Sequence, residues 1–243
     1  RPNDAVFAMI GREPPLDFFR RSGVKIRGEW RPSTWISFAL IMLAAVFIYH
    51  WKTDAGIPIK HWFQEAGLFP FNLEKPDDPS SLWGTLRLSM TQPSFYYSLA
   101  YCLAVALFGF RRTRRRRTPY VKMQTLTLVL IQCIPLFLLP YLLLPWAGHN
   151  GWFAAGSLMQ PVADALFPAS EWAEHGREYW RSLGLILAWP LFFWNVFTAQ
   201  PLWTWLAISL VQTFVVIPLI VWRWGKGAYC GWICSCGALA ETM

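Results

Sequence analysis

Charged side chains are scarce in this sequence, and one long stretch lacks them altogether. Asp, Glu, Lys and Arg make up 15% of the 243 residues, whereas a soluble domain usually carries about a quarter. Residues 182–222 contain no charged side chain, which is enough chain for about two crossings of a bilayer. The composition therefore excludes an ordinary soluble domain, although the length alone would allow one or two of them.

Motifs for soluble catalysis and for ion transport are also missing. The sequence has no nucleotide-binding glycine loop, no Ser–His–Asp arrangement and no His-x-x-x-His helix. The clearest hydrophobic segments hold no charged group away from their ends, where Lys122 and His50 lie, which argues against a proton pump or an ion-coupled transporter. Asp164 counts as an intramembrane carboxylate, able to release protons near a quinone, only if its segment crosses the bilayer.

Histidines suited to heme are missing from the hydrophobic segments as well. Membrane cytochromes need axial ligands, often His, that face inward from the membrane-spanning helices. The four histidines lie at segment ends or in loops: His50, His61, His149 and His175. We therefore expect no facing pair inside the bilayer.

The hydrophobic segments predict an all-α fold, a polytopic membrane helical bundle of five or six transmembrane helices with a short Cys-rich C-terminal tail. A helix needs about 20 mostly apolar residues to cross a hydrocarbon core of about 30 Å. Five segments approach or meet this length: 33–51, 89–110, 121–146, 182–198 and 202–222. Residues 152–168 read as a sixth span, a re-entrant segment or a surface helix. Residues 60–68 read as a short amphipathic helix lying on the membrane surface.

Basic residues determine the expected orientation. Residues 1–31 form a polar basic N-terminal segment, and residues 111–117 form a loop that is almost entirely arginine. Such loops stay in the cytoplasm by the positive-inside rule; a nucleic-acid contact is the alternative for an arginine run, but hydrophobic segments flank this one closely. With five spans the C-terminal tail would lie outside, and with six it would return to the cytoplasm. The distribution of Lys and Arg favours six.

Three of the five cysteines lie together near the C-terminal end, in the segment Cys230-Gly-Trp-Ile-Cys234-Ser-Cys236. Thiolates are soft ligands that suit iron–sulfur clusters, zinc or Cu(I). Gly231 and Gly237 allow the backbone to approach a bound cluster closely. Buried packing cysteines, a disulfide and a zinc site are the alternatives, but the paired short spacings of zinc ribbons are missing. The crowding of the three thiols favours an iron–sulfur site.

The segment Tyr229-Cys-Gly-Trp-Ile-Cys, followed by Gly237-Ala-Leu, resembles the Cys-Gly-Trp-x-Cys-Pro-x-Gly signature of membrane-bound polyferredoxins, the 4Fe-4S binding proteins of the NapH, NosR and CcoG type. The resemblance covers about 15 residues. It implies a bacterial inner (cytoplasmic) membrane protein with a [4Fe-4S] cluster at a cytoplasmic helix end. It also implies electron transfer that involves quinones or other redox partners. Two features depart from the signature: Ser235 replaces its proline, and Cys236 is additional.

The resemblance leaves the ligand set one cysteine short. Cys230 and Cys234 match the family's ligand positions, and Cys236 joins them because it lies so close in sequence. A [4Fe-4S] cluster normally takes four cysteines. We expect the fourth beyond Met243, in a longer domain that residues 225–243 begin, or from a partner. Cys102 and Cys133 lie within predicted spans and read as packing residues.

The leading hypothesis is a membrane-anchored electron-transfer protein that passes electrons between the quinone pool and a redox partner protein. It would serve as a subunit of an oxidoreductase system rather than as a stand-alone enzyme. The apolar bundle, residues 32–224, would hold the cluster close to the membrane surface. One alternative is a structural or assembly subunit of a larger membrane complex without a cluster. Another is an assembly factor that handles copper or zinc through its thiolates; a nucleic-acid partner is not expected.

Overall fold

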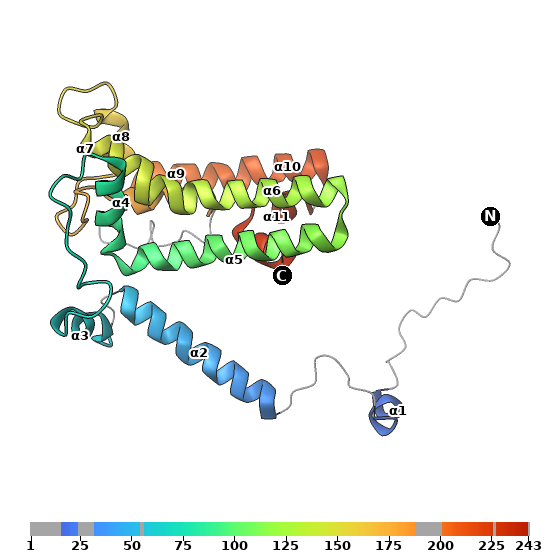
Figure 1. Cartoon of the computed structure of the whole chain (residues 1–243). Coiled ribbons are helices and arrows are strands. Elements are labelled where there is room, and N and C mark those ends of the chain that lie inside the picture. The colour runs from blue at the N-terminus through green and yellow to red at the C-terminus, as the bar shows by residue number, and fades with distance from the viewer. Residues whose placement is uncertain (1–15, 24–31, 54–55, 188–200, 226, 243) are drawn as a thin grey trace. The chain divides into compact units, whose positions relative to one another are not determined.

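The computed structural model of the chain describes residues 16–23, 32–53, 56–187, 201–225 and 227–242 (Figure 1). These residues form helices and contain no β-strand, only an isolated antiparallel bridge between Ala169 and Arg177. The all-α prediction is therefore confirmed for the described residues. The chain divides into two units, Arg1–His50 and Trp51–Met243, which are described separately.

The first unit holds α1 (Leu16–Arg21) and nearly all of α2 (Pro32–Lys52). The 21 residues of α2 rise by about 32 Å, which matches the thickness of a bilayer core. None of its residues is buried, and large apolar side chains such as Ile41 and Leu43 are exposed. A helix that is hydrophobic on all sides is a membrane span or a buried core helix. Its length and composition make α2 a candidate membrane span.

The second unit is built on a long helical hairpin, α5 (Pro93–Arg116) and α6 (Pro119–Cys133). The predicted loop 111–117 is wrong for residues 111–116, which form the last turns of α5. The turn that follows contains Arg117, whose φ of 50° lies in the left-handed region. Thr118 caps α6, because its side chain accepts a hydrogen bond from the backbone N–H of Val121 at 3.3 Å. Proline at the first position of both helices costs no hydrogen bond there.

Beyond α6 the helix continues without a break through the π-helical segment η1 (Ile134–Leu143) into α7 (Leu144–His149). Pro140 lies inside η1. Proline has no N–H to donate and its ring crowds the preceding turn, so the helix widens locally. A second long helix is made of α9 (Trp203–Val211), η4 (Gln212–Val216) and α10 (Ile217–Trp224).

Shorter elements complete the second unit. They are α3 (Ile59–Glu65), α4 (Leu82–Met90), α8 (Gln160–Leu166), η2 (Tyr179–Leu185), α11 (Gly227–Trp232) and α12 (Ser235–Thr242). The position of α3 agrees with the short helix expected over residues 60–68.

Four helices among the described residues are long and apolar enough to cross a membrane: Pro32–Lys52, Pro93–Arg116, Pro119–His149 and Trp203–Trp224. They coincide with four of the predicted spans, which indicates a multi-pass membrane protein. Within residues 152–168 the one helix is α8, whose seven residues rise by only about 10 Å and cannot cross as a helix. Of the predicted span 182–198, residues 188–198 lie outside the described residues.

Two small buried clusters hold the second unit together. In one, Phe167, Tyr179 and Trp205 pack against each other, and the indole N–H of Trp205 donates to the Leu166 carbonyl at 2.6 Å. In the other, Val105 of α5, Leu128 of α6 and Ala238 of α12 meet, all three fully buried. The second cluster makes the C-terminal segment part of the bundle.

Candidate functional site

The clustered cysteines lie on a helical hairpin formed by α11 and α12. Gly225, with a φ of 90°, turns the chain at the end of α10. The chain then folds back, and α11 and α12 pack against each other and against α6 (Figure 1). A tail lying beyond the last helix is the simplest reading of the sequence. In the structure the segment instead returns along the bundle, as far as Tyr101 in the middle of the apolar part of α5.

The two arms of this hairpin touch at Gly237. A Cβ atom built on Gly237 would lie 1.7 Å from the carbonyl oxygen of Cys230 and 2.7 Å from its carbonyl carbon. Only glycine permits so close an approach of one backbone to another. Gly237 therefore fixes how near the start of α12 lies to Cys230. The close neighbour is the backbone of Cys230, so the expected approach of Gly237 to a bound cluster stays a prediction.

Three side chains of the bundle hold the backbone of the cysteine segment. Gln124 Nε2 donates to the carbonyl of Gly231 at 2.9 Å, and Gln132 Nε2 donates to that of Ile233 at 2.8 Å. The single hydroxyl proton of Tyr101 is shared between two acceptors, the carbonyl of Ser235 at 3.0 Å and Gln132 Oε1 at 3.1 Å. The three carbonyls belong to alternate residues across the turn between α11 and α12. We call Tyr101, Gln124 and Gln132 the carbonyl cradle.

The carbonyl cradle is buried and internally connected. Gln132 is 0% and Gln124 4% exposed, and the Tyr101 hydroxyl also lies 3.1 Å from Gln132 Oε1. Buried polar groups that lose a partner cost about 1–3 kcal/mol each. The cradle therefore fixes the loop in one position.

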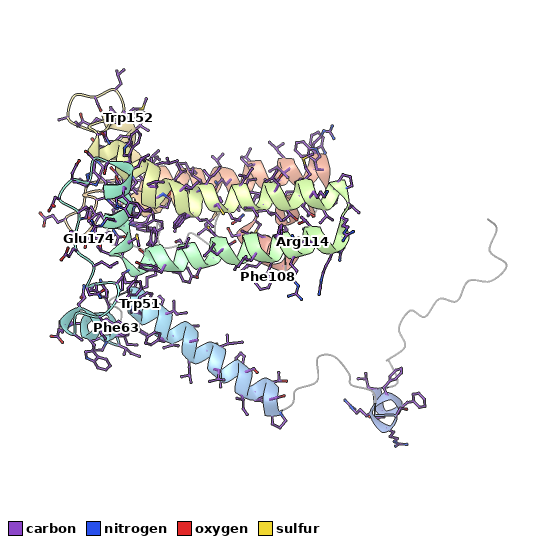
Figure 2. All side chains as sticks on the ribbon, in the orientation of Figure 1. Trp51, Phe63, Phe108, Arg114, Trp152 and Glu174 are labelled. Atoms are coloured by element: carbon purple, nitrogen blue, oxygen red, sulfur yellow. The ribbon has the colours of Figure 1, made fainter. Side chains whose placement is uncertain are left out.

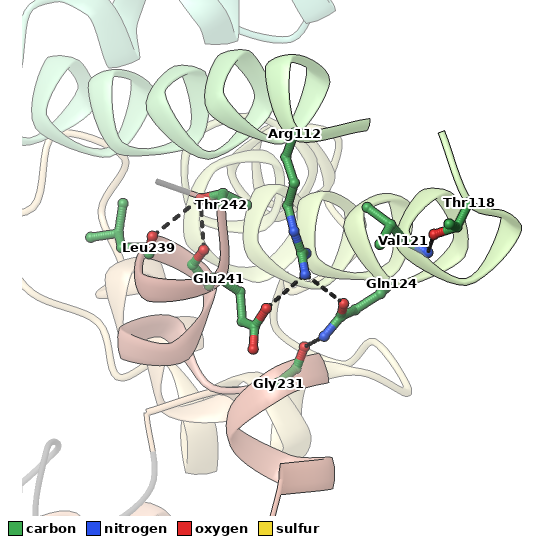
Figure 3. Close-up of polar contacts among 9 residues, drawn as sticks. Arg112, Thr118, Val121, Gln124, Gly231, Leu239, Glu241 and Thr242 are labelled. Carbon is green, nitrogen blue, oxygen red and sulfur yellow. Dashed lines mark hydrogen bonds and ion pairs between the residues drawn. The ribbon is translucent and has the colours of Figure 1, made fainter. Parts of the chain in front are cut away.

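An arginine of the basic run fastens the second arm of the hairpin (Figure 3). Arg112 Nη2 donates to Gln124 Oε1 at 2.9 Å and to Glu241 Oε2 at 2.7 Å. The Arg112 side chain is only 11% exposed, whereas Arg115 and its neighbours are exposed. Arg112 thus connects α5, α6 and α12. The sequence predicted only that the arginine run marks the cytoplasmic side, so this structural role was missed.

The thiols of Cys230 and Cys234 both lie near enough to that of Cys236 to interact with it electrostatically. Cys230 and Cys236 are exposed, Cys234 is half-buried, and none is in a disulfide. The thiols of Cys236 and Cys234 are in hydrogen-bond contact; burial, and then the neighbouring Cys234, raise the pKa of Cys236. No group of three or more His, Cys, Asp or Glu side chains is arranged to hold a metal ion in the part of the chain that the structure describes.

The surroundings of these thiols fit an anionic, sulfur-rich group. The first N–H groups of a helix have no intrahelical partner, and α12 begins between Cys234 and Cys236. Ser235 Oγ, also between them, is buried without a hydrogen-bond partner among the described residues. These donors suit the sulfur atoms of a [4Fe-4S] cluster. That Cys230, Cys234 and Cys236 are three of its ligands stays a prediction.

The two remaining cysteines form a pair of their own. Cys102 of α5 and Cys133 of α6 are in thiol–thiol hydrogen-bond contact inside the bundle. Each follows directly on a cradle residue, Tyr101 or Gln132, in the sequence. Their role as packing residues stays a prediction.

Sequence reasoning missed the carbonyl cradle, although a signal was present. Gln124 and Gln132 are polar residues in a mostly apolar span, and polar groups within a bilayer need partners inside the protein. The sequence does not say which carbonyls they serve.

Comparisons with known proteins identify a 4Fe-4S binding segment in the same C-terminal part of the chain. Residues 203–243 match the family described as "4Fe-4S binding domain". "Regulatory protein NosR" of Pseudomonas aeruginosa is 38% identical over 52 residues, which cover 21% of this chain and 6% of that protein. No solved structure matches the chain. The predicted resemblance to polyferredoxin-type 4Fe-4S binding proteins is confirmed for the C-terminal part.

Proposed function

We propose that this chain, whose residues 203–243 match a 4Fe-4S binding domain, is a membrane-anchored electron-transfer protein that binds a [4Fe-4S] cluster through Cys230, Cys234 and Cys236. The observation that carries the proposal is the carbonyl cradle. It fixes the loop carbonyls toward the bundle and leaves the thiols of Cys230 and Cys236 exposed. Ligands held in this way need little reorganisation when they bind a cluster.

The cluster supplies one-electron redox chemistry, and the protein supplies placement and tuning. If a cluster binds at these thiols, Ser235 Oγ and the N–H groups at the start of α12 would be the nearby donors that could hydrogen-bond to its sulfur atoms. Such bonds are one of the terms that set the reduction potential. The fourth ligand comes from outside the described residues or from a partner protein.

The proposed circuit runs between the quinone pool and a redox partner protein, in the inner membrane of a bacterium. The exposed apolar side chains of the four spans support a lipid environment.

The contact between Arg112 and Glu241 supports an orientation. It places the end of α12 beside the arginine run, residues 111–117, which the positive-inside rule assigns to the cytoplasm. A chain that starts and ends in the cytoplasm crosses the membrane an even number of times. We therefore propose four or six spans with a cytoplasmic cysteine segment, rather than five.

Reduction of the full-length protein in nanodiscs tests electron transfer. The anaerobically purified protein is mixed with a short-chain quinol, and the visible absorbance of the cluster is followed. Bleaching that is reversed by an added oxidised partner supports the circuit. If dithionite bleaches the cluster but quinol does not, quinol is not the electron donor. The assignment of a cluster would then still hold.

A matched set of serine variants tests the ligands. Cys230→Ser, Cys234→Ser and Cys236→Ser should each lower the iron content per chain, because a hydroxyl is a poor ligand for cluster iron. Cys133→Ser is the control, with wild-type iron content expected. If all four variants keep wild-type iron, the ligand assignment is wrong.

A further inference from the structure

A second polar cluster lies at the end of the α5–α6 hairpin opposite to the arginine run. Figure 2 shows Trp152 and Glu174 at this end and Arg114 at the other. His149, the last residue of α7, and His175, in the segment between α8 and η2, face each other here. The distance from His149 Nε2 to His175 Nδ1 is 3.1 Å. Both rings line a cavity of about 250 Å³.

The hydrogen-bond pattern determines the tautomer of His175. The hydroxyl of Ser89 donates to the carbonyl of Tyr141 at 2.6 Å, because a carbonyl can only accept. That hydroxyl proton is then not available to His175 Nε2, which lies 2.9 Å from Ser89 Oγ. The Nε2–H of His175 must therefore donate to Ser89.

A neutral His175 with its proton on Nε2 has its lone pair on Nδ1. Nδ1 is the nitrogen that faces His149 and the cavity. Ser89 is 0% exposed, so the bond that fixes this tautomer is shielded from water. The hydroxyl of Ser89 thus fixes the His175 ring with the lone pair of Nδ1 directed toward His149 and the cavity.

We infer that His149 and His175 form a binding site for a divalent transition metal ion such as Zn²⁺, with water at the remaining positions. Imidazole nitrogen is a preferred ligand for zinc, copper and nickel. With Zn–N bonds of about 2.0–2.1 Å, nitrogens 3.1 Å apart subtend an angle of about 95–100° at the metal, close to the tetrahedral value.

Two neighbours complete the argument. A metal-bound histidine usually donates its other ring N–H to an oxygen acceptor, and the bond from His175 to Ser89 Oγ has this form. Metal binding requires His149 Nε2 to lose its proton, which passes to Nδ1 or to solvent. Arg177 also lines the cavity, and its positive charge is paired with the carboxylate of Asp164 at 2.7 Å. Two protein ligands agree with the lack of any three-ligand group in the described residues.

Zinc binding by the full-length protein tests this site. The protein is equilibrated with Zn²⁺, dialysed and assayed for zinc per chain, as wild type and as His149→Gln, His175→Gln and His61→Gln. His61 is the matched control, because it is exposed and its one ion-pair partner is Glu65. Wild type and His61→Gln should bind about one zinc more than the other two variants. The cysteines contribute the same background to all four.

Ser89→Ala gives an independent test that keeps both ligands. Loss of such a supporting hydrogen bond should weaken zinc binding by about 10–100-fold at unchanged stoichiometry. Equal zinc content in wild type, His149→Gln and His175→Gln would overturn the site. If a histidine variant does not fold, the Ser89→Ala titration decides, and an unchanged affinity there also overturns it. Iron content should be the same throughout, so this site can fail without affecting the proposed cluster.

Discussion

Replacing Gly237 by alanine places a methyl group where the structure has no space. The new Cβ would lie 1.7 Å from the Cys230 carbonyl oxygen, whereas real Cβ contacts essentially never fall below 3.0 Å. The two backbones must therefore separate by about 1.3 Å at this point, since the obstacle is main chain and cannot rotate away. Overpacking of this kind typically costs about 1–3 kcal/mol.

The separation moves Cys236 away from Cys230 and opens the cysteine hairpin. We expect Gly237→Ala to retain little iron when purified anaerobically, while the helix content by circular dichroism stays close to wild type, because α5 and α6 are untouched. Gly227→Ala is the matched control, in the same hairpin but with nothing within 4 Å of its added Cβ. It should keep wild-type iron and melt no lower, since alanine favours a helix over glycine by about 1 kcal/mol.

The assay is iron and acid-labile sulfide per chain, together with the midpoint of thermal unfolding for each variant. If Gly237→Ala keeps both the iron content and the melting temperature of wild type, the close backbone contact does not exist. The hairpin geometry argued from it would then be wrong.

Three further predictions follow from other contacts. Gln132→Met should lower stability by about 1 kcal/mol, because the part-buried carbonyl of Ile233 loses its donor. An unchanged unfolding midpoint would contradict the role of the carbonyl cradle. Arg112→Gln should release α12 and raise its proteolytic cleavage rate several-fold, whereas Arg115→Gln, at an exposed position, should behave as wild type. Burial lowers the pKa of His175 from 6.5 to about 3. As the pH drops below about 6.5, His175 is therefore protonated in the unfolded chain before it is protonated in the folded protein. The free energy of unfolding should fall between about pH 6.5 and pH 3. His175→Gln should flatten that fall in thermal unfolding measured with a chelator present, and an equally steep fall would refute the assignment.

Local sequence features predicted much of the fold, because they act through nearby residues. An apolar run of about 20 residues is helical in lipid whatever surrounds it, so four spans follow from hydropathy alone. The proline–arginine turn between α5 and α6 is similarly local. The crowding of Cys230, Cys234 and Cys236 is a property of the sequence itself, and the family match to residues 203–243 agrees with it.

The position of the cysteine segment depended on contacts that no local pattern encodes. Tyr101 and Ser235 are 134 positions apart, and Arg112 and Glu241 are 129 apart. A polar residue in an apolar span indicates that a hydrogen-bond partner lies inside the protein. Which residue is the partner depends on how three helices pack. The fold-back of the hairpin was therefore beyond sequence reasoning.

The histidine pair illustrates the same limit. The sequence predicts no facing pair inside the bilayer, and the pair that forms lies at the end of α7. His149 and His175 are 26 positions apart and meet because the chain between them turns back on itself. Ser89, 86 positions from His175, orients the ring from another helix. Such a site becomes visible only once three separate segments are placed together.

The central claim is that the three clustered thiols hold a [4Fe-4S] cluster against the carbonyl cradle. The most direct measurement is iron and acid-labile sulfide in full-length protein purified without exposure to air. The account predicts about four of each per chain in the wild type and a marked loss of both in Cys234→Ser. Protein that contains neither iron nor sulfide under these conditions would contradict it.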